Sequence, residues 1–325
     1  MAKKNKKIKV GIIGAGNCAT SLVEGVQYYA EHTDAKTGVM KMDIGGYLAG
    51  DVEFVVGYDI DERKIGLPLG KALRQKPNCS WNIVDTIKST APVFEAPVID
   101  GYAGLMDNYP EENRFLVSEK LRNSTDMNRV SWTPRLERKW KDKVIKELKA
   151  RKVEILVNYL PVGSQKTTEF WAEICLETGI SFVNCIPVFI ASDPVWEQRF
   201  IDAGIPLIGD DMRSQFGASI VSQMLQELAF ERGHHVKAHI QRNVGGNTDF
   251  LNMEDKNRLA SKKISKENVI RAQNEIRGIS TNDSFLHAGP SEYIHFYGDN
   301  KVANFRLELE GFGGSPVLFL SLIHI

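Results

Sequence analysis

A cluster of small residues near the N-terminus has the spacing of a dinucleotide-binding turn. The segment Gly14–Ala19 (GAGNCA) follows a short apolar run, Ile8–Ile13, and precedes an amphipathic segment. The first glycine permits a tight turn, the second lets the backbone approach a pyrophosphate, and the small Ala19 allows close packing of the following helix. The free N–H groups of that helix would face the phosphates. The predicted pyrophosphate site is Gly14, Ala15, Gly16, Asn17 and Cys18.

A carboxylate is expected at the end of the second strand of such a fold, where it accepts hydrogen bonds from the adenosine ribose. The segment Val52–Asp59 supplies Asp59, and a carboxylate there would repel a 2′-phosphate, so we expect NAD rather than NADP. Asp61 is an alternative for the same role. The carboxylate lies further along than the usual ~20 residues. The additional residues lie in His32–Asp51, a polar, glycine-containing stretch that we predict to be a loop.

Composition excludes several classes of partner. The 325 residues carry 41 Lys and Arg against 41 Asp and Glu, so the net charge gives no case for binding nucleic acid, and the basic segment Lys3–Lys9 is interpreted as a solvated arm. No apolar run approaches the ~20 residues of a membrane span. The four cysteines have no metal-ligand spacing, which predicts reduced thiols in a cytoplasmic protein without a metal site. They are Cys18, Cys79, Cys175 and Cys185.

Strands and helices alternate through the first two-thirds of the chain, which predicts an α/β fold with a doubly wound parallel sheet of the Rossmann type over residues 1–211. After the second strand we expect a helix at Arg135–Arg151, a strand at Val153–Asn158, a helix at Thr167–Thr178, and strands at Ile180–Val183 and Ile205–Asp211. Ligands of such sheets bind beyond the carboxyl ends of the strands. Asn158–Ser164 and Asn184–Phe189 are therefore expected at the cofactor rim.

A further helix is predicted at Ala218–Glu231, with its apolar side chains facing inward. Those side chains are Ile220, Met224, Leu225 and Leu228. Ser214 and Gln215 lie where this helix starts, so their polar groups and the free N–H groups suit an anion. Alternatively, Ser214 only caps the helix.

The pattern changes after Gly233 to that of a second, α+β domain over residues 212–313. We expect strands at His235–Arg242, Glu292–Tyr297 and Val302–Gly313, with polar helices near Met253–Arg258 and Lys266–Ile276. The strands have little helix to cover them. Because bare sheet faces and edges need a partner, this domain is expected to mediate homo-oligomerisation.

Seven segments together resemble myo-inositol-1-phosphate synthase, in its shorter bacterial and archaeal branch. They are Gly14–Ser21, Asn158–Gly163, Asn184–Pro194, Gly209–Gln215, Gly245–Phe250, Ser261–Lys266 and Gly298–Ala303. The resemblance covers nearly the whole chain and implies a homotetrameric, NAD-dependent isomerase of inositol and phospholipid biosynthesis. Its implied reaction turns D-glucose 6-phosphate into 1L-myo-inositol 1-phosphate by oxidation at C5, enolisation, aldol closure of C6 onto C1, and return of the hydride.

The resemblance also implies roles for individual residues. Lys262, Lys266 and Lys301 would carry proton transfer and oxyanion stabilisation, and Asp249 would orient one of the lysines. Lysine suits both tasks, since burial and neighbouring cations lower its pKa. The implied cofactor contacts are Asp211, Ser214, Asn247, Thr248, Gly298 and Asp299, and the implied contacts to the substrate phosphate are Ser214, Gln215 and Gly217. No metal ligand is implied, while a requirement for a divalent or monovalent cation stays open.

The C-terminus departs from the family. Members continue past Arg306–Gly311 into a segment that returns to the nucleotide domain and carries a further aspartate and lysine of the site. Val317–Ile325 does not resemble that segment, so residues 314–325 are interpreted as a truncated or frame-shifted remnant. Two alternatives to the isomerase therefore remain, a catalytically impaired NAD-binding protein and an NAD-dependent dehydrogenase of a phosphorylated sugar.

Overall fold

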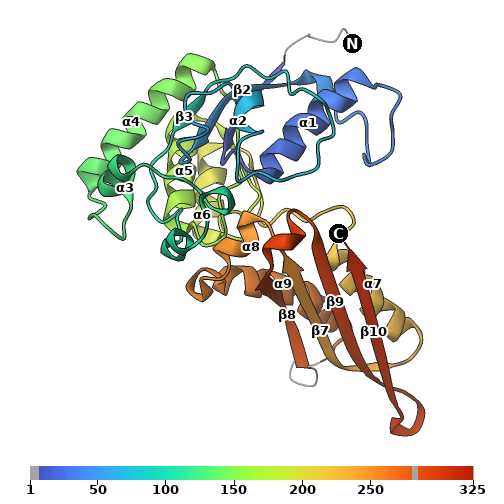
Figure 1. Cartoon of the computed structure of the whole chain (residues 1–325). Helices are drawn as coiled ribbons and strands as arrows, with labels where there is room; N and C mark the ends of the chain where they lie inside the picture. The colour runs from blue at the N-terminus through green and yellow to red at the C-terminus, as the bar shows by residue number, and fades with distance from the viewer. Residues whose placement is uncertain (1–6, 280–284, 325) are drawn as a thin grey trace. The chain divides into compact units, whose positions relative to one another are not determined.

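The computed structural model describes residues 7–279 and 285–324. The chain divides into two compact units, a first unit up to Asp210 and a second unit from Asp211 onward (Figure 1). Across the described ranges, no helix is both long enough and apolar enough to cross a membrane.

The first unit is built on a six-stranded sheet with the strand order β3-β2-β1-β4-β5-β6. Its strands are β1 (Ile8–Ile13), β2 (Val52–Asp59), β3 (Val93–Glu95), β4 (Ile155–Asn158), β5 (Ser181–Asn184) and β6 (Leu207–Ile208). All neighbours pair in parallel. This order reverses direction between β1 and β4, as in a Rossmann fold, so the predicted doubly wound sheet is confirmed.

Helices cover both faces of this sheet and create two cores. They are α1 (Asn17–Glu31), α2 (Leu69–Ala72), α3 (Glu119–Thr125), α4 (Pro134–Arg151), α5 (Gln165–Thr178) and α6 (Pro194–Ala203), with 3-10 turns η1 (Ala49–Asp51), η2 (Gly104–Asn108) and η3 (Glu111–Asn113). Successive strand residues point to opposite faces. Ile12 therefore packs with Val23 of α1, while Ile13 packs with Trp171 of α5. Each such buried side chain stabilises the fold by about 1.5–3 kcal/mol.

The ends of α6 show how local sequence sets the helix bounds. Asp193 caps the helix by accepting hydrogen bonds from the N–H groups of Val195 and Trp196, and Pro194 occupies the first turn, where no N–H partner is needed. Gly204 ends the helix with φ 65°, a left-handed conformation that glycine adopts without a steric penalty.

The second unit is built on a mixed sheet with the strand order β10-β9-β7-β8. Its elements are α7 (Ala218–Glu231), β7 (His235–Gly245), α8 (Thr248–Asn252), η4 (Lys256–Arg258), α9 (Ala260–Ile276), β8 (Phe285–Tyr293), η5 (His295–Tyr297), β9 (Lys301–Glu310), η6 (Phe312–Gly314) and β10 (Pro316–His324). β7 pairs in parallel with β8 and antiparallel with β9. The α+β class expected for this part of the chain is confirmed.

Two strand assignments differ from the sequence prediction. The strand expected at Glu292–Tyr297 begins at Phe285, and residues 295–297 form a 3-10 turn because the chain reverses at Gly298, with φ 55° and ψ −127°. Residues 314–325, interpreted as a remnant, contribute β10, whose residues Pro316–His324 pair antiparallel with Glu310–Val302 of β9.

The inward face of α7 was predicted wrongly at two of its four positions. Met224 and Leu228 are 64% and 56% exposed, whereas Ser222 and Gln226 are buried. Leu225 packs against the core of the second unit, as predicted. The reason is a buried histidine on β7. His239 contacts the Ser222 hydroxyl through Nε2 at 2.6 Å and the Gln226 amide oxygen through Nδ1 at 2.8 Å. Because a buried imidazole must be hydrogen-bonded, the helix turns a polar stripe toward the sheet.

Candidate active site

The glycine turn has the geometry that its residue types predict. Gly14 has φ 86°, and a Cβ there would lie 2.7 Å from the carbonyl oxygen of Tyr159, so only glycine fits. Gly16 is the N-cap of α1, and no side chain accepts a hydrogen bond there to cap the helix. A Cβ on Gly16 would meet nothing within 4 Å. The first amides of α1 therefore border open space, as an anion site at a helix N-terminus requires.

Asn17 and Cys18 begin α1 beside this turn. The Asn17 amide oxygen accepts hydrogen bonds from the N–H groups of Cys79 (2.9 Å) and Ser80 (3.3 Å), so this side chain fastens a distant loop to the start of the helix. Cys18 is exposed. The four cysteines, all within the described ranges, form no disulfide.

Asp59 lies directly against the turn. Its Oδ2 accepts a hydrogen bond from the Ala15 N–H at 2.8 Å, and its Oδ1 accepts from the N–H groups of Ile60 and Asp61. Asp61, the alternative candidate, is fully buried and bound to the Arg63 guanidinium and to the Leu116 N–H. Of the two carboxylates, only that of Asp59 therefore contacts the glycine turn, while that of Asp61 is bound by residues that follow β2.

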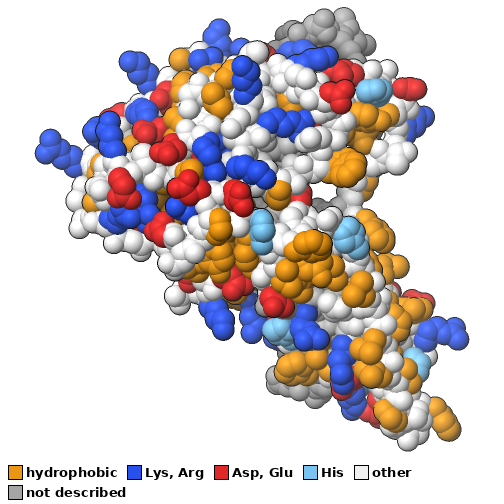
Figure 2. Space-filling model, viewed as in Figure 1, with side chains coloured by type: hydrophobic (Ala, Val, Ile, Leu, Met, Phe, Trp, Pro, Cys, Tyr) orange, Lys and Arg blue, Asp and Glu red, His pale blue; other side chains and the backbone are white. Residues whose placement is uncertain are grey.

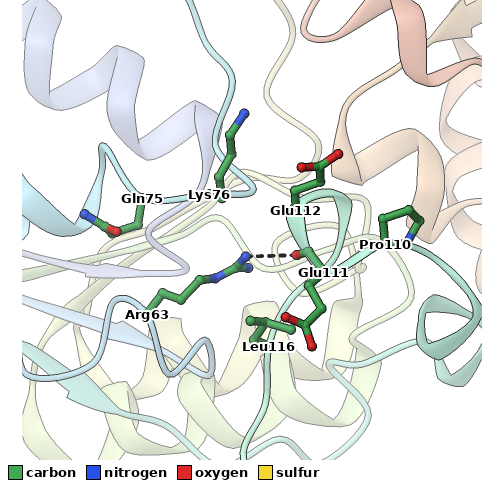
Figure 3. A pocket seen from close by; sticks show the side chains of 7 residues that line it. All are labelled: Arg63, Gln75, Lys76, Pro110, Glu111, Glu112 and Leu116. Atoms are coloured by element: carbon green, nitrogen blue, oxygen red, sulfur yellow. Dashed lines mark hydrogen bonds between the residues drawn. The ribbon is translucent and has the colours of Figure 1, made fainter.

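An open pocket of the first unit is lined by three segments, which follow β2, follow α2 and surround η3 (Figure 3). Its lining residues carry charges of both signs and are Arg63, Gln75, Lys76, Pro110, Glu111, Glu112 and Leu116. The Arg63 guanidinium donates to the backbone oxygen of Glu111 at 2.9 Å. Because Asp61 and the Arg114 carbonyl hold the same guanidinium, Arg63 joins two loops of the first unit.

A row of buried polar side chains links the carboxyl ends of β4, β5 and β6. The Asn158 amide donates to the Asn184 oxygen at 2.9 Å, and the Asn184 amide donates to Asp210 Oδ1 at 2.7 Å. The Asp210 carboxylate also accepts from the N–H groups of residues 190–192. The row joins the two segments predicted at the cofactor rim. Sequence reasoning did not find this role of Asp210.

In the second unit, one carboxylate organises the start of α9. The Lys262 ammonium donates to Asp211 Oδ1 at 3.1 Å, and the Ser265 hydroxyl donates to Asp211 Oδ2 at 2.5 Å. Asp211 has φ 55°, a left-handed conformation that aspartate tolerates better than most residues. Ser265 was missed by sequence reasoning because a serine inside a lysine-rich helix carries no signal without its partner.

Lys266 lies one helical turn beyond Lys262, on the same face of α9. Burial, followed by the positive charges of Lys262 and Lys301, lowers the pKa of Lys266 to about 7, while the negative charges of Asp211 and Asp249 oppose the shift. The structure thus brings together four residues that the resemblance assigns to catalysis, with Asp211. An amine with a pKa near 7 is half neutral at physiological pH and can accept a proton.

Lys301 starts β9, and its ammonium lies 5.7 Å from the centre of the Phe250 ring. The Phe250 ring packs against the end of β7, where a Cβ on Gly245 would lie 2.6 Å from the ring carbons. A Cβ on the next residue, Gly246, would collide with the carbonyl of Ile294. The paired glycines therefore let the residues after β7 meet the loop that leads to Lys301.

Asn247 and Asp299 connect these two loops. Asn247 caps α8 by accepting from the N–H groups of Asp249 and Phe250, and its amide donates to Asp299 Oδ1 at 2.8 Å. Burial raises the pKa of Asp299, although this hydrogen bond and the charge of Lys301 oppose the shift. Thr248 is buried as the first residue of α8.

The interpretation of Ser214 as a simple helix cap is wrong. The N-cap of α7 is Gly217, and no side chain caps this helix. Ser214 and Gln215 are exposed in the segment before it. In the described ranges, no group of three His, Cys, Asp or Glu side chains could hold a metal ion.

The strand order and the uncapped glycine turn define the first unit as a dinucleotide-binding fold of the Rossmann type, and the second unit adds a cluster of lysines. A family model described as myo-inositol-1-phosphate synthase matches residues 217–321. The inositol-3-phosphate synthase of Corynebacterium glutamicum is 40% identical over 95% of this chain and 80% of its own length. That of Mycobacterium tuberculosis H37Rv is 39% identical over 96% and 78%. The chain belongs to the myo-inositol-1-phosphate synthase family.

Solved structures agree with this fold. The crystal structure of Ari2 has a TM-score of 0.72 and 25% identity, covering 98% of this chain and 81% of its own. A myo-inositol-1-phosphate synthase-related protein from Thermotoga maritima has a TM-score of 0.74 and 23% identity, covering 98% and 82%, and supports the fold alone.

Proposed function

We propose that this protein is an inositol-3-phosphate synthase, which converts D-glucose 6-phosphate into 1L-myo-inositol 1-phosphate. The observation that carries the proposal is the lysine cluster of the second unit, because three lysines in one charge network supply both a base and fixed cations. The named relatives at 39–40% identity over nearly the whole chain support the same reaction.

NAD is the cofactor of the proposal, and the residues at the glycine turn fit it. The fit rests on the open space at Gly16, the uncapped amides of α1, and the Asp59 carboxylate at the turn. When bound, NAD supplies a reversible hydride acceptor, so the reaction has no net redox change. Asp59 would hold the ribose end, and a carboxylate there disfavours a 2′-phosphate.

Lys266 is the base of the proposal. Its pKa of about 7 leaves a neutral amine available to take the proton when the ketone enolises. Lys262 and Lys301 provide positive charge for the enolate and aldol oxygens, which carry developing negative charge. Asp211 fixes Lys262 in place, and Asp249 adds negative charge near Lys266.

The substrate phosphate is assigned to the N-terminus of α7. The amides there have no side-chain cap, and Ser214 and Gln215 lie in the exposed segment just before Gly217. A phosphate at this position would satisfy free N–H groups and the positive end of the helix dipole.

One assay separates this function from its alternatives. Purified protein is mixed with glucose 6-phosphate and NAD, with and without added divalent and monovalent cations, and both inositol phosphate and NADH are measured. The synthase forms inositol phosphate without net NADH. Accumulating NADH would indicate a sugar-phosphate dehydrogenase, and neither product would indicate a catalytically impaired NAD-binding protein.

A homotetramer is part of the proposal. Leu318, Leu320 and Leu322 alternate along β10 and are 53%, 64% and 62% exposed, which is apolar surface that a partner would cover. Figure 2 shows hydrophobic side chains over the strands of the second unit, mixed with charged ones. Light scattering at micromolar concentration tests the assembly, and a stable monomer would contradict it.

A further inference from the structure

A buried lysine, far from the lysine cluster in sequence, lies beneath the glycine turn. Lys64 is 1% exposed. Its ammonium donates to the Ala15 carbonyl oxygen and to Asn78 Oδ1, both at 2.9 Å, and lies 3.8 Å from Asp59 Oδ2. Neither the glycine motif nor the family resemblance assigns this residue a role.

These contacts hold the backbone of Ala15 from both sides. Its N–H donates to Asp59, and its carbonyl accepts from Lys64 and, at 3.0 Å, from the Asn78 amide. Ala15 directly precedes Gly16 and the first amides of α1. The direction in which those amides point is therefore set by a charged pair behind the turn.

The same pair also sets the electrostatic potential at the turn. Asp59 is 8% exposed and would by itself place a nearly buried negative charge beside the pyrophosphate site. Charges that are not screened by water act strongly over a few ångströms. Lys64 cancels this charge from the protein side while leaving the outer side of the turn free.

We propose that Lys64 is a positioning residue for NAD, which fixes the glycine turn and neutralises Asp59 where the pyrophosphate binds. The inference rests on the proposed use of NAD. It predicts coupling between the two residues, since removing the cation alone leaves Asp59 uncompensated, whereas removing both charges does not.

Calorimetric titration of the full chain with NAD tests this coupling. Lys64→Met should weaken NAD binding by about 10- to 100-fold, in line with the loss of a buried charge-assisted contact. Because Asp59→Asn also changes the expected ribose contact, the coupling is measured by a double-mutant cycle. The loss of NAD-binding free energy in the double variant Asp59→Asn with Lys64→Met should be smaller than the sum of the losses in the two single variants. Additive losses, or wild-type affinity in Lys64→Met, would overturn the proposal.

Binding of ADP and of adenosine distinguishes a role of Lys64 at the pyrophosphate site from a general loss of structure. Lys64→Met should lose affinity for ADP, which carries the pyrophosphate, but keep its affinity for adenosine. The matched control is Arg122→Met, which removes another buried cation of the first unit, paired with Asp107 and Asp126. This control should lower the melting temperature and leave NAD affinity unchanged. Equal losses for ADP and adenosine would contradict the role assigned to Lys64.

The Asn78→Ala variant and NAD binding by the wild-type chain complete the test. If Lys64→Met does not fold, Asn78→Ala removes one contact to Ala15 and one to Lys64 while the charges remain, and a several-fold loss of NAD affinity is expected. Unchanged affinity in a folded Asn78→Ala would overturn the proposal. A wild-type chain that does not bind NAD would overturn the proposed function as well, whereas normal binding by Lys64→Met would overturn this inference alone.

Discussion

Lys64 in the first unit is 1% exposed and Lys266 in the second is half-buried, and the two lysines have neighbours of different charge. Lys64 lies among acceptors, the Ala15 carbonyl, the Asn78 amide oxygen and the Asp59 carboxylate. Lys266 lies near two cations and two carboxylates, and burial together with the cations lowers its pKa to about 7. The same side chain thus holds a backbone turn where the fold surrounds it with oxygen atoms, and becomes a candidate base where burial and like charges lower its pKa.

The helix that carries Lys266 explains its burial. Ile270 and Asn274 follow Lys266 at four-residue intervals on α9, and both are 1% exposed. The Asn274 oxygen accepts a hydrogen bond from the Gln226 amide at 2.8 Å, and Gln226 in turn contacts His239. Because hydrogen bonds specify one rotation of the helix, this polar network directs the lysine face inward.

The largest expected effect tests whether Lys266 acts as the base. Lys266→Gln keeps the length of the side chain and removes the amine, so turnover should fall by about 10²–10³ with the fold intact. NAD affinity should not change, because the glycine turn is untouched. Steady-state kinetics, circular dichroism and NAD titration measure the three quantities.

Lys263→Gln is the matched control for this variant. Lys263 lies on the same helix but its side chain is 57% exposed, beside Glu267. It should retain turnover within about twofold, as a surface substitution does. Equal losses in the two variants, or normal turnover in Lys266→Gln, would remove Lys266 from the proposed chemistry.

Next in size is the dependence of stability on pH that the polar network behind α9 creates. Burial lowers the pKa of His239 to about 4, well below its ordinary value. The unfolded chain therefore binds a proton that the folded chain excludes, and stability is lost as pH falls from about 6.5 toward 4. The loss should total about 3 kcal/mol. Denaturant unfolding across this range should show it, and His239→Gln should abolish that part of the pH dependence; an unchanged slope would contradict the assignment.

A comparable effect is expected at the glycine turn. Asp59→Ala removes the acceptor of the Ala15 N–H and the expected ribose contact, so NAD binding should weaken by about 1–3 kcal/mol. Titration with NAD measures it. Wild-type affinity in this variant would exclude Asp59 from the site and return attention to Asp61.

The smallest effect concerns the charges around Lys266. Asp211 raises the pKa of Lys266, so Asp211→Asn should lower it. The acid limb of the rate profile should then move to lower pH, even if the rate at the optimum falls because Lys262 and Ser265 lose their partner. A limb that moves to higher pH would show that another group is the base.

Sequence alone predicted what depends on local pattern. The glycine turn and β2 follow from short-range spacing, and their bounds agree with the structure. The inward face of α7 followed only in part, since Leu225 packs inward but Met224 and Leu228 are exposed, and a buried histidine contacts polar side chains of the helix. Lys64 and Ser265 were not found, because their partners are 49 and 54 residues away. Only the fold shows such pairs.

The central claim is that burial and neighbouring charges, rather than residue type, make Lys266 a base, and the pH at which its amine loses a proton tests it most directly. Amine-selective labelling followed by mass spectrometry, over a pH series from 5 to 11, follows each lysine separately. Lys266 should reach half of its limiting labelling rate near pH 7, and Lys266→Gln identifies its peptide. Half-maximal labelling near the ordinary lysine value of about 10.4 would contradict the account.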